Sequence, residues 1–111
     1  MLGLLLRPPH AHNIVHNGKR WEVRSRATKK RGRIALIEVT RTSWRVVAFA
    51  TLARSMPLTH AMASQHAALH QAPGVVGRYA TPHAWVLQDV RGVPKRVCVP
   101  KKRGCVVWVK L

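Results

Sequence analysis

The stretch NGKRWEVR, residues 17–24, decides the fold more than any other part of this 111-residue chain. Its Asn-Gly pair tolerates a left-handed turn, and the alternation of apolar and polar residues in WEVR predicts the start of a strand. On a strand, Glu22 and Arg24 point to the same face. Glu22 is one of only three acidic residues in the chain, and three basic residues flank it here. Because an exposed ion pair contributes only about 0–1 kcal/mol, we interpret the cluster as a pocket for a polar ligand. An ion bridge that only pins the turn is the structural alternative.

Positive charge is the second informative feature, since the formal net charge is +17. Eight Lys and Arg residues lie between Lys19 and Arg33, and seven lie between Arg91 and Lys110, a segment without any acid. Such clustering predicts a polyanionic partner, whereas a merely solvated surface usually mixes both signs of charge. We expect nucleic acid, and RNA in particular. A membrane partner is not expected, because the basic segments do not have the pattern of an amphipathic helix.

The length and the apolar fraction of 47% predict a single folded domain over residues 1–111. No apolar run approaches the roughly 20 residues of a spanning helix, and MLGLLLRPPH is too short for a signal peptide. We expect an intracellular protein, with cytoplasm, nucleus and mitochondrion all open. The oligomeric state stays open as well.

Neither the cysteines nor the histidines predict a metal site. Cys98 and Cys105 form no metal motif, and we expect them to stay reduced, although a hairpin could bring them together. The pairs His12/His16 and His66/His70 have helical i, i+4 spacing, but no carboxylate or thiol completes either set. We therefore expect no metal and no cofactor.

Apolar and β-branched runs predict strands, and Pro, Gly and charged runs predict the connections between them. The expected strands are 2–6, from 21 onward, 33–40, 44–54, 83–90, 95–99 and 105–110. A short helix is expected over 11–16, and a longer one from Pro57 to about His70, followed by a loop over 71–82. The expected core residues are Leu36, Val46, Ala48, Trp85, Leu87, Val97 and Trp108.

The order of these pieces resembles the ASCH domain, a branch of the PUA-like β-barrel superfamily. The segment LLRPPHAHNIVHNGKRWEVRSRATKKRGRIALI, residues 5–37, carries most of the resemblance. Matches to the ASCH pattern are Arg7, Pro9, Ala11, Lys19, Glu22, Arg24 and Gly32. The resemblance implies an α+β fold, a small mixed or antiparallel PUA-like β-barrel with two helices, over the whole chain.

Two positions depart from the ASCH pattern. His10 stands where the family usually has Trp, and this keeps a flat ring in the cleft. Asn17 stands where the family usually has Gly, and Asn is the residue besides Gly that best adopts a left-handed turn. The backbone path is therefore expected to be kept.

The resemblance implies a nucleic-acid-binding domain in which Lys19, Glu22 and Arg24 line a cleft that holds a nucleotide. The expected ligand residues are His10, Lys19, Glu22, Arg24, Arg26, Lys29, Lys30, Arg31, Lys101, Lys102 and Arg103. Some ASCH proteins are similar to N4-acetylcytidine amidohydrolases with a catalytic lysine, threonine and glutamate. Here the lysine corresponds to Lys19, but Glu22 stands at the threonine, and residues 61–71 contain no carboxylate.

Enzymatic activity is therefore not the leading expectation. The alternatives are a hydrolase of modified nucleosides or of RNA with Lys19 and Glu22 as catalytic residues, and a structural component of a ribonucleoprotein.

Overall fold

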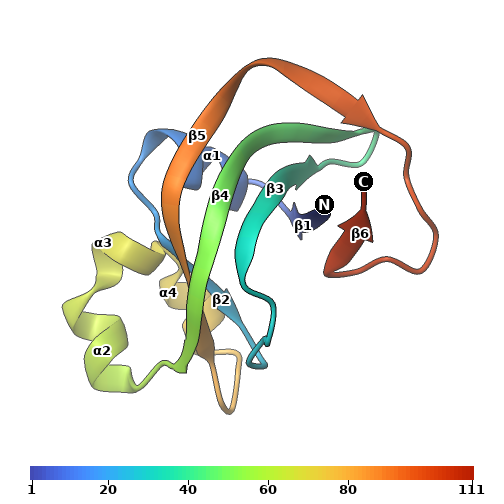
Figure 1. The fold of residues 1–111 in the computed structure, drawn as a ribbon. Coiled ribbons are helices and arrows are strands. Elements are labelled where there is room, and N and C mark those ends of the chain that lie inside the picture. The colour runs from blue at the N-terminus through green and yellow to red at the C-terminus, as the bar shows by residue number, and fades with distance from the viewer.

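Six strands form one curled mixed sheet, and four short helices cover one side and one end of it (Figure 1). The computed structural model describes all residues, 1–111. The strands are β1 (Leu2–Leu6), β2 (Trp21–Arg24), β3 (Gly32–Val39), β4 (Trp44–Pro57), β5 (His83–Val99) and β6 (Trp108–Lys110). The helices are α1 (His10–His16), α2 (His60–Gln65), α3 (Ala67–His70) and α4 (Pro73–Val76).

The strand order is β2-β5-β4-β3-β1-β6, and only the β1–β3 pair is parallel. The pairing register shifts once between β3 and β4 and three times between β4 and β5. Such bulges bend a strand and increase its twist, so β4 and β5 arch over the molecule (Figure 1). The edge strands β2 and β6 do not pair with each other, so the sheet is a half-barrel.

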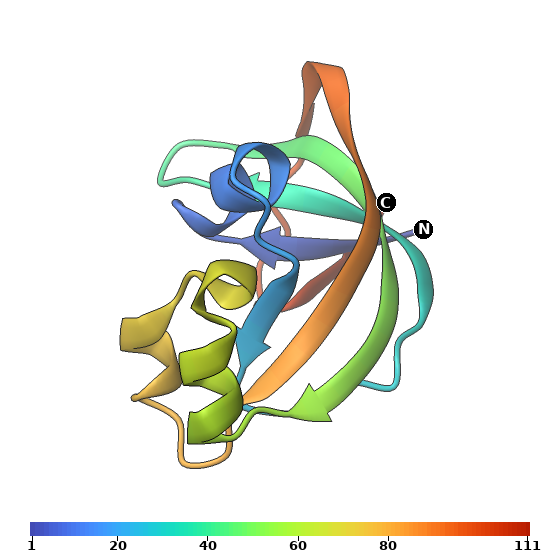
Figure 2. The same cartoon turned by 90° about the vertical axis from the view of Figure 1, so that its left-hand side faces the viewer.

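The concave side of the sheet and α1 enclose the largest part of the core. Leu4 and Leu6 of β1 face this side, while Leu5 between them faces a second cluster with Trp44 and Val109. Because β1 is buried on both faces, its sequence is continuously apolar and does not alternate. A third cluster lies between β2, β5 and helices α2 to α4, and Figure 2 shows these helices stacked beside β2.

The predicted helix from Pro57 to His70 was wrong in its extent. β4 continues to Pro57, which pairs with His83, and Thr59 then begins α2, since its side-chain hydroxyl accepts the backbone N–H of Met62 at 3.1 Å. His66, with φ −122°, separates α2 from α3. The expected loop over 71–82 contains the additional helix α4, which has Pro73 in its first turn.

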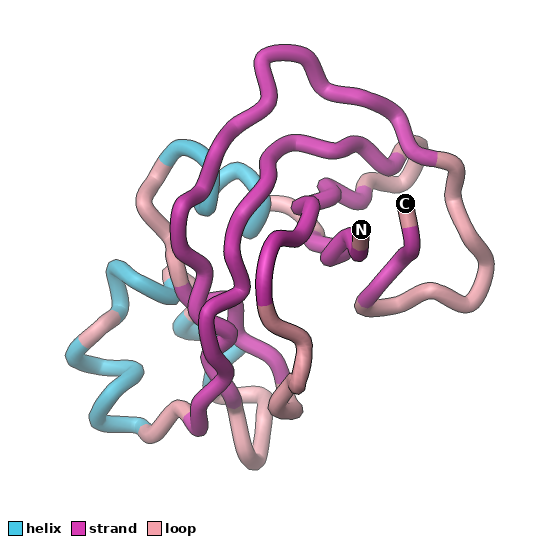
Figure 3. The backbone as a smooth tube through the Cα atoms, viewed as in Figure 1, coloured by secondary structure: helices cyan, strands magenta, loops and turns pink.

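β5 is one strand, although Arg91–Pro94 was predicted to be a turn between two strands (Figure 3). Both halves of β5 pair with β4, and the residues between Gly92 and Val97 form a large bulge in that pairing. Asp89 takes a positive φ of 47° in the same strand. The pairing of β5 with β4 on both sides of Arg91–Pro94 therefore outweighs the tendency of this segment to form a turn.

Five of the seven predicted core residues are buried, namely Leu36, Val46, Ala48, Trp85 and Leu87. Trp108 is partly buried. Val97 is 60% exposed, so its prediction was wrong. The reason is that β2 covers only His83–Val86 of β5, which leaves the half of β5 around Val97 as a free sheet edge. The strand predicted over 105–110 is also shorter and begins at Trp108.

Candidate functional site

The turn after α1 directs Lys19 into the protein interior. Gly18 has a φ of 73°, whereas Asn17 stays at −119°, so glycine takes the left-handed conformation that the resemblance assigned to Asn17. The Lys19 side chain is fully buried. Its Nζ donates a hydrogen bond to the backbone carbonyl of His70 and lies 3.8 Å from Oε1 of Glu22.

Glu22 and Arg24 project from the same face of β2, as the strand period predicts. Nε of Arg24 donates to Oε2 of Glu22 at 2.9 Å, and Nη2 donates to the Leu5 carbonyl at 2.8 Å. The guanidinium also lies 5.5 Å from the ring centroid of Trp85, within the range of a cation–π contact. Trp85 itself stacks on Trp108 with centroids 5.8 Å apart. These contacts fix Arg24 on three sides, while its Nη1 has no partner within the protein.

A cavity of about 380 Å³ opens in front of this pair, and we call it the cleft. Its lining combines three arginines, one carboxylate, aromatic and imidazole rings and a thiol. The polar and aromatic lining residues are Arg7, His10, Glu22, Arg24, Trp44, Arg78, Tyr79 and Cys105. Lys19 does not line the cleft but lies behind Glu22. The cleft therefore presents an excess of positive charge around one nearly buried carboxylate.

Burial perturbs two titratable groups here. Removal of Lys19 from water lowers the pKa of its ammonium, and the nearby charge of Glu22 only partly opposes that effect. Burial also lowers the pKa of His10 below 6.5, again against the opposing effect of Glu22. Nδ1 of His10 is buried without a hydrogen-bond partner. His10 therefore carries a hydrogen-bonding capacity that no protein group uses.

Comparisons with known proteins identify the fold. No protein-family model and no curated protein matches the chain. Among solved structures, the ASCH protein of Zymomonas mobilis superposes with a TM-score of 0.66 at 22% identity, covering 82% of this chain and 68% of that one. Two crystal structures of single-substitution mutants of that protein give TM-scores of 0.69 and 0.74, at 19% and 18% identity. They cover 86% and 99% of this chain, and 73% and 87% of theirs.

The chain has the ASCH fold. This confirms the fold class that the sequence predicts, with two differences. The half-barrel of this ASCH fold stays open between β2 and β6, and it carries four short helices in place of two.

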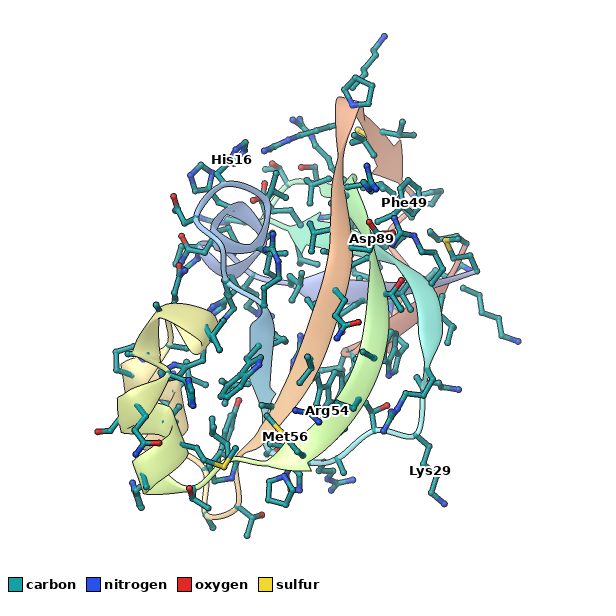
Figure 4. The ribbon with its side chains drawn as sticks, turned by 60° about the vertical axis from the view of Figure 1, so that its left-hand side comes forward. His16, Lys29, Phe49, Arg54, Met56 and Asp89 are labelled. Carbon is teal, nitrogen blue, oxygen red and sulfur yellow. The ribbon has the colours of Figure 1, made fainter.

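The ASCH fold brings together four of the predicted ligand residues, namely His10, Lys19, Glu22 and Arg24, while the other seven lie apart. Arg26, Lys29, Lys30 and Arg31 lie in the β2–β3 loop, and Lys101, Lys102 and Arg103 lie in the β5–β6 loop. None of these seven lines the cleft. Figure 4 shows Lys29 extending into solvent at the end of the molecule opposite His16.

The sequence analysis missed several cleft residues. Arg7 matches the ASCH pattern but was not expected to bind ligand, and Arg78 and Tyr79 lie in a segment that was predicted only as a loop. An Arg-Tyr pair next to glycine in a basic protein is the signal that could have identified the latter two. Trp44 and Cys105 come from β4 and the β5–β6 loop, which no local motif connects with β2.

The remaining expectations concern thiols, metals and membranes. Cys98 and Cys105 are both free thiols. His12 and His16 do approach each other, with ring centroids 4.6 Å apart, but no group of three or more potential metal ligands occurs. None of the four helices has the length and apolar character needed to cross a bilayer.

Proposed function

We propose that this ASCH-fold protein binds nucleic acid, with RNA as its partner, and holds one nucleotide in the cleft. The observation that supports the proposal is the pairing of three arginines with a single nearly buried carboxylate in one cavity. Arg7 and Arg78 provide charge for a phosphate. Glu22, Arg24 and His10 provide acceptors and donors at fixed positions for a base edge, and Trp44 and Tyr79 add flat surfaces.

The two basic loops extend the binding surface outside the cleft. The β2–β3 loop carries Arg26, Lys29, Lys30 and Arg31, and the β5–β6 loop carries Lys101, Lys102 and Arg103. Their side chains have no acidic partners, since the five ion pairs use other basic residues. Cations on loops that lack acidic partners suit phosphate contacts, which supply affinity without selecting sequence.

Binding without catalysis is favoured over an amidohydrolase because Lys19 is completely enclosed behind Glu22. A group that does not contact the cleft cannot transfer a proton to a ligand there without rearrangement. The lowered pKa of Lys19 is the one observation in favour of a hydrolase, because a general base needs a pKa near the working pH. Incubation with RNA and with N4-acetylcytidine, followed by product analysis, tests this second candidate.

Titration of fluorescent single-stranded RNA oligonucleotides against Arg24→Lys tests the proposal. Lysine keeps the charge but loses the planar fork that contacts Glu22 and Leu5. We expect affinity to fall about tenfold, since a charge-assisted hydrogen bond contributes roughly 1.5–3 kcal/mol. Arg45→Lys is the matched control, because Arg45 is exposed on β4 and does not line the cleft. Equal affinity of both variants and the parent would place the nucleotide site elsewhere.

A further inference from the structure

Three hydrogen bonds tie the end of α3 to the turn that precedes β2. The backbone N–H of Arg20 donates to the Leu69 carbonyl at 2.8 Å, and Lys19 Nζ donates to the His70 carbonyl. Nε2 of Gln71 donates to the Asn17 carbonyl at 2.6 Å. Three consecutive residues of α3 and its cap therefore bond to residues 17–20, and the middle bond is the one that holds the buried ammonium.

The side chain of His70 fixes this arrangement from the other side. It is 1% exposed, and its Nδ1 accepts the backbone N–H of Ala72 at 2.9 Å. Because Nδ1 is an acceptor, the proton of the neutral ring must lie on Nε2, which is 2.8 Å from the Ala63 carbonyl and donates to it. The ring thus connects α2 with the segment that leads into α4.

The hydrogen bond from the Ala72 N–H to Nδ1 joins the His70 side chain to the backbone two residues onward, and the His70 carbonyl group lies within the loop that this bond closes. Gln71, which lies between His70 and Ala72, has a φ of 50°, a left-handed conformation that a non-glycine residue adopts at a cost. The orientation of the His70 carbonyl therefore depends on the bond that its own side chain makes two residues onward. Lys19 Nζ is directed at that carbonyl.

We propose that His70 is the positioning residue of the cleft. In its neutral Nε2–H form it orients its own carbonyl, which holds Lys19 behind Glu22, and Lys19 in turn fixes the carboxylate that faces the ligand. The same bond to Ala72 sets the start of α4, beyond which Arg78 and Tyr79 line the cleft. The effect on ligand binding rests on the proposed function, whereas the enclosure of Lys19 does not.

Two substitutions separate the two hydrogen bonds of the His70 imidazole, the one to Ala72 and the one to Ala63. Asparagine accepts the N–H two residues onward in an Asx-turn, so His70→Asn keeps the bond to Ala72 and loses the one to Ala63. Glutamine reaches farther and can donate to the Ala63 carbonyl, so His70→Gln keeps that bond and leaves Ala72 unpaired. Both variants keep a neutral amide in place of a neutral ring.

The experiment measures acylation of individual lysines by mass spectrometry together with RNA affinity. In the parent, Lys19 is expected to react at least about a hundredfold more slowly than exposed Lys29, because it must await local opening. His70→Gln should raise Lys19 acylation about tenfold, corresponding to roughly 1.4 kcal/mol in opening free energy. It should also weaken RNA binding severalfold, because the His70 carbonyl is no longer oriented and Glu22 is held less firmly even while Lys19 stays enclosed. His70→Asn should stay near the parent in both measurements, and Lys29 should react equally in all three proteins.

Several results would overturn the proposal. Protection of Lys19 that is unchanged in His70→Gln, alongside a lower melting temperature, would make His70 a purely structural residue. Increased acylation with unchanged RNA affinity would show that Lys19 placement does not control the cleft. If the parent binds no RNA, the proposed function fails, but the acylation measurement still decides whether His70 keeps Lys19 enclosed. Should His70→Gln not fold, nitrogen NMR of the parent decides, because an Nδ1–H tautomer contradicts the proposal.

Discussion

Glu22 has the most demanding environment of the three acidic residues. It is 4% exposed and lies between Lys19 and Arg24, whereas Glu38 and Asp89 pair with arginines at the surface. Removing one partner of a buried ion pair leaves an uncompensated charge, which costs far more than the intact pair gains. The cluster at residues 19–24 is therefore both a candidate ligand site and a stability determinant.

Glu22→Gln should lower the free energy of unfolding by roughly 3–5 kcal/mol, because two cations would then face a neutral amide inside the protein. An exposed ligand residue could lose its charge with little effect on the melting temperature, but Glu22 is only 4% exposed, so we expect a large effect. Urea denaturation measures the effect. Glu38→Gln is the control, since its pair with Arg96 is partly exposed and should contribute at most about 1 kcal/mol. Equal destabilisation by both variants would contradict the conclusion that Glu22, unlike Glu38, forms a buried ion pair.

His10 should titrate below its ordinary value of 6.5, because burial disfavours the imidazolium. Glu22→Gln should lower this pKa further, since it removes the negative charge that stabilises the protonated ring, whereas Glu38→Gln should leave it unchanged. Proton NMR of the His10 ring measures both midpoints in folded protein. The corresponding stability is present above pH 6.5 and is lost as the pH falls through the folded-state pKa. A midpoint above 6.5 would refute this account.

The sequence predicts the part of the site that depends only on the geometry of a single strand. Glu22 and Arg24 are two residues apart on a strand, so their common face needs only the strand period. Arg78 and Tyr79 reach the cleft through the packing of α4, which no short-range pattern encodes. The partner of Lys19 is a backbone carbonyl of His70, and every residue has such a group, so the sequence could not single it out.

At the scale of elements, β1 depends on close packing against its neighbours. Gly3 pairs with Ala35 of β3 and Val109 of β6. A Cβ on Gly3 would clash with Cδ1 of Ile37 and would approach Cγ1 of Val109 to 3.3 Å. Glycine is required there by the space between strands and side chains.

Gly3→Ala should therefore destabilise the protein by about 1–3 kcal/mol through overpacking. Ile37→Val removes the clashing Cδ1 and alone should cost about 0.5–1.5 kcal/mol. The double variant should be more stable than the sum of the two single effects predicts, because the two sites share one space. Thermal unfolding of all four proteins completes the cycle. Strict additivity would show that the added methyl is accommodated in another way.

The elements differ in how far the sequence predicts them. Apolar and β-branched runs identified β1, β3 and β4, because burial of one or both faces leaves a periodic signature. The division of α2 from α3 lies at His66, whose φ is −122°, and no Pro or Gly marks this break in the sequence. β5 remains one strand through Arg91–Pro94 because β4 pairs with it on both sides of the bulge.

At the scale of the whole molecule, the two basic loops and the cleft form separate positive regions on one small body. The loop residues carry charge without acidic partners, and the cleft adds three arginines. RNA affinity should accordingly combine a cleft contribution with a larger, sequence-independent contribution from phosphate contacts.

If about six phosphates are neutralised, the logarithm of affinity should fall with the logarithm of salt concentration at a slope of about −4 to −5. Replacing Lys29, Lys30 and Arg31 with alanine should weaken binding to all sequences alike and flatten the slope by about 2. Arg24→Lys keeps its charge and should leave the slope unchanged while reducing affinity. Fluorescence anisotropy from 50 to 300 mM salt, roughly the range where such effects are resolved, provides the test. An affinity independent of salt would contradict a polyanionic partner.

The pairing of β1 with both β3 and β6 has a consequence during synthesis on the ribosome. β1 is synthesised well before one of its two neighbours, the strand at Trp108–Lys110. Closing so long a loop is slow and entropically unfavourable. Until it closes, a leucine-rich strand retains an unpaired edge, the kind of surface that promotes aggregation and recruits chaperones. The nascent chain thus exposes the edge of this leucine-rich strand until β6 has been synthesised and has paired with it.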